Sequence, residues 1–253
     1  MLGATDGRTL KTTETSLHVL DLVLEHGGLT LAELDRMVDK PKSSLHSHLN
    51  TLLACRYLVK DGRTYLASFK FAERGERARR SELESVATEA VERLAEITGE
   101  EANFTVLEHG RLLLLHGSSN QSSGPDAETG FRTEYYLHNT AAGKAILAQL
   151  EPERVERILD EWGMPREIEA TITDRERLYE QLEEIADDGY AIVDEEFAPG
   201  LVAVGTPVRV DGEIIGGVSV GGPKYRINTS RLHGELAEAV IDAAGEMENA
   251  LTD

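Results

Sequence analysis

The sequence predicts an α+β protein of two parts, in which helices and a small hairpin precede a larger region of mixed strands and helices. The chain has 253 residues, well above the roughly 100–150 residues that are usual for one domain. The pattern of apolar residues also changes near residues 75–82. Helical spacing and one hairpin come before this point, and a mixture of strand and helix spacing comes after it. We therefore expect an N-terminal domain over residues 1–75, a linker helix over 76–98 and a second domain over 99–253.

Charge is divided unequally between the two parts. The chain contains 26 Lys/Arg and 46 Asp/Glu, a net charge of −20. Residues 1–80 hold 13 basic and 10 acidic residues, so residues 81–253 carry −23. Residues 40–80 alone hold ten basic and three acidic residues, a local charge of +7 to which a polyanion could bind. The acidic remainder is compatible with a halophilic, haloarchaeal source and equally with solubility in ordinary cytosol.

The composition excludes several classes of protein. No stretch of about 20 uninterrupted apolar residues is present, and residues 1–11 lack the apolar core of a secretory signal. We therefore expect a soluble, cytoplasmic protein without a membrane partner. The single cysteine, Cys55, excludes an intramolecular disulfide framework and a multi-cysteine zinc site, and its apolar helical setting indicates an inert thiol.

Two helices are predicted at the start of the chain. Residues 15–26 have helical apolar spacing and end at Gly27-Gly28, a C-cap signal. Thr30 and Glu33 form a capping-box pattern, so a short second helix should cover residues 30–38. The predicted apolar faces consist of Leu17, Leu20, Val23 and Leu24 in the first helix and Leu31, Leu34, Met37 and Val38 in the second.

A third helix and a hairpin complete the predicted N-terminal domain. The helix follows Pro41, which the first helical turn tolerates, and it buries leucines at positions 45, 49, 52 and 53. Two β-prone runs then flank Asp61-Gly62, a strong hairpin signal. Three helices followed by a hairpin indicate a winged helix-turn-helix.

The third helix presents a polar face opposite its leucines. Short hydroxyl and amide side chains can approach base edges, and basic side chains can hold phosphates. Such a face is most often only a solvated surface, but the hairpin, the local charge and the order of helices favour binding to double-stranded DNA. The candidate DNA-binding residues are Lys40, Lys42, Ser43, Ser44, His46, Ser47, His48, Asn50, Thr51 and Arg63.

The second part reads as an antiparallel sheet flanked by helices, because several strands follow one another without crossover helices. An amphipathic connector over residues 81–98 leads to a hairpin about His109-Gly110 and a polar loop over 118–130 that could lie over a pocket. The remaining predicted elements are helices over 140–150, 151–162, 174–187 and 229–250, and strands over 189–193, 201–210 and 213–222, the last two joined by a hairpin about Asp211-Gly212.

Motifs in both parts resemble the IclR family of transcriptional regulators. TSLHVLDLVLEHGGLTLAEL and PKSSLHSHLNTLLACRYL are similar to the family's DNA-binding domain. LHNTAAGKAILAQL, DDGYAIVDEEFAPGLVAVGTPV and IIGGVSVGGPKYRI follow its effector-domain motifs in order. The resemblance spans residues 14–228 and implies a GAF-like effector domain without a cofactor, a homodimer or homotetramer, and a small, often anionic, effector. It also implies control of sugar or organic-acid catabolism.

The resemblance further implies an effector pocket. At the N-terminus of the helix near residue 141, free N–H groups would favour a carboxylate. The implied pocket residues are Ala141, Ala142, Gly143, Asp194, Glu195, Leu201, Ala203, Ser219 and Gly221.

Several positions depart from the family pattern. Ala203 stands where cysteine is common, Gly221 where serine is common, and Val193 where some members have an acidic residue. Ser47 replaces a frequent arginine, and Arg56 replaces a C-capping glycine, a position that would demand a positive φ at a cost of about 1 kcal/mol. The effector and the operator therefore need not be those of other members.

One alternative is an enzyme or a ligand-storage protein whose N-terminal helices make only protein contacts. Asp194, Glu195 and Glu196 could act as an acid–base pair, but such chemistry needs a substrate cleft and a defined separation. We assign no catalytic residues.

Metal and nucleotide binding have little support. His109, His116 and His138 show no HxH or HExxH spacing, so we expect no metal site. Gly216-Gly217 and Gly221-Gly222 lack the following helix of a dinucleotide fingerprint, and they indicate close backbone approach within the sheet.

Overall fold

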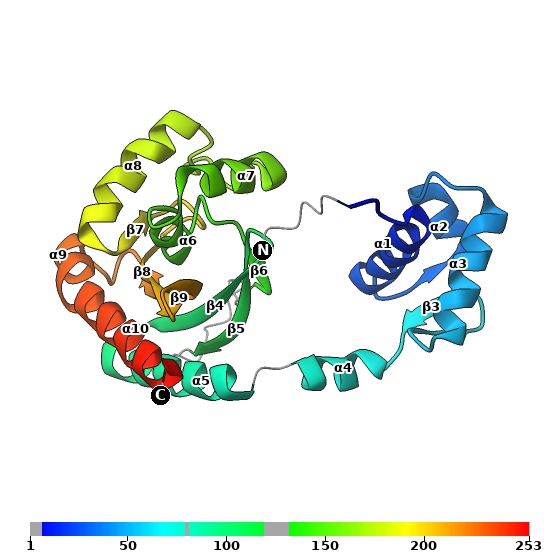
Figure 1. The fold of residues 1–253 in the computed structure, drawn as a ribbon, viewed down its shortest axis with the longest axis horizontal. Helices are drawn as coiled ribbons and strands as arrows, with labels where there is room; N and C mark the ends of the chain where they lie inside the picture. The colour runs from blue at the N-terminus through cyan, green and yellow to red at the C-terminus, as the bar shows by residue number, and fades with distance from the viewer. Residues whose placement is uncertain (1–6, 79–80, 119–131, 253) are drawn as a thin grey trace. The chain divides into compact units, whose positions relative to one another are not determined.

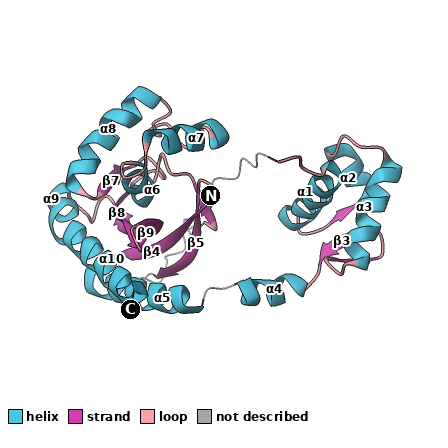
Figure 2. Ribbon diagram, in the orientation of Figure 1, coloured by secondary structure: helices cyan, strands magenta, loops and turns pink. Residues whose placement is uncertain are grey.

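The computed structural model describes residues 7–78, 81–118 and 132–252, and these fall into two compact units that meet in sequence between Arg79 and Arg80. Figures 1 and 2 show the helices and strands of both units. The predicted pocket-covering loop over 118–130 lies, apart from its first residue, outside the described part of the chain. No helix among the described residues is long and apolar enough to cross a bilayer.

The N-terminal unit is a winged helix-turn-helix followed by one additional helix. Its three strands form an antiparallel sheet in the order β1-β3-β2. Its core is formed by α1, α2, α3 and the inner side of this sheet. The helices are α1 (Lys11–Glu25), α2 (Leu31–Met37), α3 (Lys42–Ala54) and α4 (Lys70–Ala78), and the strands are β1 (Leu29–Thr30), β2 (Leu58–Asp61) and β3 (Thr64–Ala67).

Two local predictions for this unit are confirmed. The Thr30 hydroxyl accepts a hydrogen bond from the Glu33 amide while the Glu33 carboxylate accepts one from the Thr30 amide, so α2 begins at a complete capping box. Arg56 has φ of 62°, the left-handed conformation that glycine would adopt without strain.

Other predictions for this unit are wrong in detail. Leu17 and Leu24 are 53% and 44% exposed, because α1 buries Val19 together with Leu20 and Val23. Asp61 pairs with Thr64, so the tip of the hairpin is Gly62-Arg63 rather than Asp61-Gly62. Cys55 is exposed, and its setting is therefore not apolar. Helix α4 was not predicted separately, because five of its nine residues are charged and it contains a central glycine.

The C-terminal unit has a six-stranded antiparallel sheet in the order β6-β5-β4-β9-β8-β7. Figure 1 shows helices on both sides of it. The strands are β4 (Glu101–Glu108), β5 (Arg111–Ser118), β6 (Glu134–Tyr135), β7 (Ala191–Asp194), β8 (Leu201–Val210) and β9 (Glu213–Pro223). The helices are α5 (Ser81–Thr98), α6 (Ala141–Leu147), α7 (Pro152–Trp162), α8 (Arg175–Asp188), α9 (Thr229–Arg231), the π-helical turn η1 (Leu232–Leu236) and α10 (Ala237–Thr252).

Both predicted hairpin turns of this sheet are confirmed. His109 and Gly110 have φ of 49° and 74°, and Asp211 and Gly212 have φ of 53° and 80°, as a two-residue hairpin with matched twist requires. The closing helix predicted over 229–250 is interrupted by η1, whose Leu232 and Leu236 are buried.

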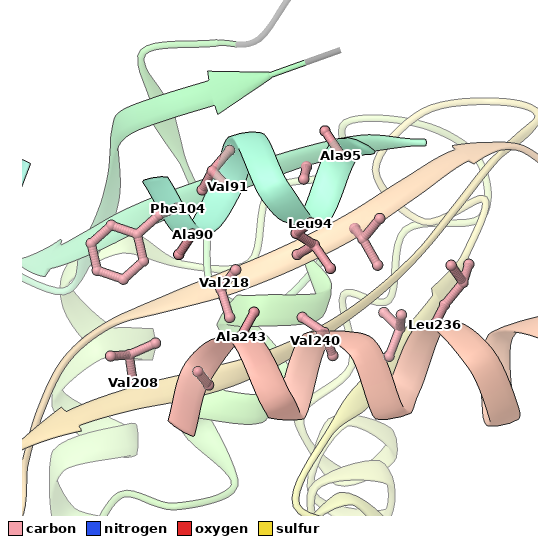
Figure 3. Packing of buried hydrophobic residues seen from close by; sticks show 14 of the residues in the cluster. Ala90, Val91, Leu94, Ala95, Phe104, Val208, Val218, Leu236, Val240 and Ala243 are labelled. Carbon is pink, nitrogen blue, oxygen red and sulfur yellow. The ribbon is translucent and has the colours of Figure 1, made fainter. Parts of the chain in front are cut away.

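Alternate residues of the central strands face two separate cores. Even-numbered residues such as Phe104, Val208 and Val218 pack against α5 and α10, as Figure 3 shows for part of this core. Helices α6, α7 and α8 pack with the ends of the sheet into a second core on the opposite face. Odd-numbered residues of β4, β8 and β9 therefore point toward the α6 side.

Helix α6 approaches the sheet through glycines. A Cβ atom on Gly205 of β8 would lie 2.5 Å from the backbone nitrogen of Ala142. A Cβ atom on Gly217 of β9 would lie 2.9 Å from the Cβ of Ala142. Any larger side chain at these positions would have to push the helix away, so the predicted close backbone approach at Gly216-Gly217 extends to α6.

Adding a methyl group at this contact should destabilise the C-terminal unit. Gly205→Ala should lower its free energy of unfolding by about 1–3 kcal/mol, the usual cost of overpacking. Urea unfolding followed by the fluorescence of Trp162, the only tryptophan of the chain, measures this unit. The matched control is Gly245→Ala in α10, where nothing lies within 4 Å of an added Cβ and the change should be neutral or stabilising. Equal unfolding midpoints for the two variants would contradict the close approach.

Candidate functional site

The polar face of α3 is open to solvent. Of the ten candidate DNA-binding residues, only Ser44 and His48 are half-buried. The exposed ones are Lys40, Lys42, Ser43, His46, Ser47, Asn50, Thr51 and Arg63.

Short hydrogen bonds order several of these side chains. The Thr51 hydroxyl donates to the Ser47 carbonyl at 2.9 Å, and Asn50 Nδ2 lies 3.1 Å from His46 Nδ1. His48 instead turns toward α1, where its Nδ1 shares a 2.8 Å hydrogen bond with the Ser16 hydroxyl. Asn50 and His46 thus form a joint polar surface, whereas His48 contributes to packing between two helices.

The basic residues of the same unit differ in how freely their charges can contact a DNA phosphate. Arg63 lies exposed at the hairpin tip. Among the described residues, Lys42 makes only a long contact of 3.8 Å with Asp35. Lys70, in contrast, donates to the Cys55 carbonyl at 2.8 Å and lies 3.9 Å from the centre of the Tyr57 ring. Its charge therefore stabilises the end of α3 as well as contributing to the local positive charge.

The C-terminal unit contains a cavity of about 230 Å³ between the N-terminus of α6 and the sheet. Strands β4, β8 and β9 supply one wall, mainly through odd-numbered residues, and the segment after β7 supplies another. The lining residues are Glu101, Asn103, Thr105, Leu112, Arg132, Tyr135, Thr140, Ala141, Ala142, Val193, Phe197, Ala198, Leu201, Val202, Ala203, Ser219, Gly221 and Gly222.

Six of the nine implied pocket residues line this cavity: Ala141, Ala142, Leu201, Ala203, Ser219 and Gly221. The other three lie outside its lining. Gly143 faces Leu137, whose carbonyl oxygen would be 2.3 Å from an added Cβ. Asp194 and Glu195 both form 2.7 Å ion pairs with Lys224, which holds the pKa of the Glu195 carboxyl below its usual range. Their carboxylates hold a turn together outside the cavity.

Two charged residues of the lining were not predicted. Arg132 donates from Nη1 to Glu167 at 2.6 Å and lies 4.6 Å above the Phe197 ring. Burial raises the pKa of the Glu101 carboxyl. The two-residue alternation of β4 places Glu101 on the same face as Asn103, so the strand pattern contained a signal that could have identified Glu101. Arg132 follows a stretch of polar sequence without periodicity, which offered no such signal.

A buried ion pair fixes the segment that carries Phe197. Lys144 of α6 is 1% exposed, and its Nζ donates to both carboxylate oxygens of Glu196 at 2.6 Å and to Gln181 at 2.7 Å. The Thr171 hydroxyl also donates to the Glu196 carbonyl at 2.9 Å. Burial lowers the pKa of Lys144, while the attached carboxylate opposes this shift. The Glu196 carboxylate therefore forms a structural ion pair with Lys144 and does not form an acid–base pair with Asp194 or Glu195.

The described histidines do not form a cluster with other potential metal ligands. Within the described ranges no three potential ligands lie close enough to hold a metal ion. His138 is buried with its Nε2 3.2 Å from the Pro165 carbonyl, and burial lowers the pKa of its imidazole.

Comparisons with known proteins agree with both units. The model of the IclR helix-turn-helix domain matches residues 13–62, and that of the C-terminal domain of bacterial IclR transcriptional regulators matches residues 76–249. The HTH-type transcriptional regulator BhcR of Paracoccus denitrificans is 34% identical over 97% of this chain and 89% of its own length. The probable HTH-type transcriptional regulator ArcR of Halobacterium salinarum is 32% identical over 95% of this chain and 94% of its own.

A solved structure has the same fold. It is an IclR homologue from Microbacterium hydrocarbonoxydans, complexed with 4-hydroxybenzoate, with a TM-score of 0.75 at 22% identity over 93% of this chain and 98% of its own. Two family models cover most of the chain in the expected order, and the related proteins are transcriptional regulators rather than enzymes. The chain belongs to the IclR family of DNA-binding transcriptional regulators.

Proposed function

We propose that this regulator binds a small carboxylate in the cavity beneath α6 and that the bound carboxylate alters promoter binding by the N-terminal unit, controlling genes of sugar or organic-acid catabolism. The observation that carries the proposal is the cavity itself, which combines apolar walls with the guanidinium of Arg132. Such a regulator acts on the chromosome, in the cytoplasm.

The size and chemistry of the cavity favour a small anionic effector. Its volume of about 230 Å³ is below the ~300–1,000 Å³ of pockets for drug-sized ligands. Arg132 can hold a carboxylate through paired hydrogen bonds. Ala141 and Ala142, the first residues of α6, line the same space. The IclR homologue from Microbacterium hydrocarbonoxydans was solved in complex with 4-hydroxybenzoate, a small carboxylate, which supports the proposal.

Exposed leucines on and next to α1 support a homo-oligomer. Leu17 and Leu24 are 53% and 44% exposed and stand seven residues apart, so they share one face of the helix. Leu10, the N-cap residue of α1, is 66% exposed. Burying this face against a second copy would pair two recognition helices for a palindromic site. For the effector to act, it must bind two arrangements of that oligomer with different affinities.

Removing a basic side chain from the DNA-binding surface should weaken binding to duplex DNA of mixed sequence. Lys42→Ala and Arg63→Ala should each reduce the slope of log K against log salt concentration by about 0.9, because each variant loses one phosphate contact. Fluorescence anisotropy at several salt concentrations measures the slope.

Two further variants serve as controls for this measurement. Arg157→Ala removes an exposed positive charge from α7 and should leave the slope unchanged. Asn50→Ala should also keep the slope but change the preferred sequence, since an amide can pair with adenine. A slope that is unchanged in both Lys42→Ala and Arg63→Ala would show that DNA binds elsewhere.

Filling the cavity should abolish the effector response. In Ala203→Leu the larger side chain occupies space that the ligand needs, whereas Ala250→Leu adds the same atoms at an exposed position of α10. A carboxylate at about 100 times its Kd should stabilise the wild-type protein and Ala250→Leu by about 2.7 kcal/mol and leave Ala203→Leu unaffected. Thermal unfolding with a panel of small carboxylates measures this, and equal stabilisation of both variants would place the ligand outside the cavity.

A further inference from the structure

Glu101 differs from the other polar side chains that line the cavity. Its carboxylate makes no hydrogen bond or ion pair with any residue that the structure describes. Each of the other polar lining side chains makes at least one hydrogen bond to the protein: Asn103 with Ser219, Thr105 with the Gly217 carbonyl, Arg132 with Glu167, Tyr135 with the Arg132 amide, and Thr140 with the Tyr136 carbonyl. One half-buried acceptor group of the cavity therefore has no donor among the described residues.

The strand register explains why Glu101 has no partner. Glu101 lies directly opposite Gly221 on β9, which has no side chain to pair with it. The charge of Arg226 acts on Glu101, but the guanidinium itself is held by the neighbouring Glu100, 2% exposed, with Nη2 at 2.5 Å from Oε2. Burial raises the pKa of the Glu101 carboxyl, as expected of an acid that has lost water without gaining a donor.

Charges of opposite sign face the same cavity. Glu101 comes from β4, and Arg132 precedes β6. Both act electrostatically on the phenol of Tyr135, which lines the cavity and whose pKa is raised chiefly by burial. The contact of Arg132 with Glu167 is made through Nη1, and a guanidinium has five N–H donors.

We propose that Glu101 determines effector specificity, and that the effector is a carboxylic acid that also carries a hydroxyl or ammonium group: Arg132 binds its carboxylate and Glu101 accepts a hydrogen bond from its donor group. This inference rests on the proposed function of the cavity. An ionised Glu101 repels a simple carboxylate, whereas a donor on the same molecule turns that repulsion into a charge-assisted hydrogen bond. An analogue without the donor also leaves the carboxylate of Glu101 unpaired, so it is strongly disfavoured.

Matched pairs of acids test the assignment with the full-length protein. The pairs are lactate and propionate, alanine and propionate, and 4-hydroxybenzoate and benzoate, with Kd measured by calorimetry. At least one donor-bearing member should bind the wild-type protein about tenfold or more tightly than its partner. Preference in the lactate or hydroxybenzoate pair identifies a hydroxyl, and preference in the alanine pair identifies an ammonium group.

Two substitutions of Glu101 distinguish the effect of its negative charge on ligand binding from the effect of its hydrogen-bond acceptor. Glu101→Gln should raise the affinity for the unsubstituted acid and reduce the preference, and Glu101→Met, of similar volume, should remove the preference. Glu213→Gln, at an exposed position of β9, should retain it. Wild-type binding without preference in every pair, or a preference unchanged in both Glu101 variants, would overturn the assignment.

Binding of mixed-sequence DNA by the same preparations distinguishes a failure of the Glu101 assignment from a failure of the proposed function. Carboxylate binding without preference contradicts the role of Glu101 alone. Failure of every acid to bind, with DNA binding intact, contradicts the effector class and the proposed function of the cavity together.

Discussion

The close approach of α6 to strands β8 and β9 determines where the cavity lies. Glycine at positions 205 and 217 lets the first turn of the helix contact the sheet, because a side chain at either position would meet Ala142. The N-terminus of α6 is then held at one edge of a space whose other walls are β4 and the segment after β7. The residues of the helix that line this space are alanines, so the backbone of α6 is close to any ligand.

The buried pair of Lys144 and Glu196 fixes the second wall relative to the same helix. Lys144 lies one turn after the cavity-lining residues of α6, and Glu196 immediately precedes Phe197. A buried pair gains little over apolar packing, but the loss of one partner leaves an unpaired charge and typically costs about 3–5 kcal/mol. The pair therefore restricts how far Phe197 and Ala198 can move from the sheet, and a ligand in the cavity is in contact with a wall that has few alternative positions.

Hydrophobic periodicity predicted the helices and strands whose residues are buried at regular intervals. It failed where contacts between distant parts of the chain determine which side chains are buried or paired. The third helix, the connector α5 and both hairpins of the large sheet follow from apolar spacing and from turn residues with positive φ. Leu17 and Leu24 were assigned to the core because one helical face cannot be distinguished from the next by spacing alone, and α1 buries Val19 instead.

Sequence motifs identified six lining residues of the cavity, but Asp194 and Glu195 form ion pairs with Lys224, which no local pattern reveals. Glu101 was missed because its lack of a partner among the described residues depends on which residue lies opposite it, which is Gly221 on β9.

DNA recognition controlled by a small carboxylate is tested most directly by sequencing the genomic fragments that the purified protein retains. The fragments should be washed at the salt concentration of the source, because high salt weakens phosphate contacts and leaves shape and base contacts to select the site. The proposed function predicts enrichment of one short, roughly palindromic site, and a change in that enrichment when a carboxylate that fills the cavity is added. Absence of any enriched site, with and without candidate carboxylates, would contradict it and would leave the N-terminal unit as a module for protein contacts.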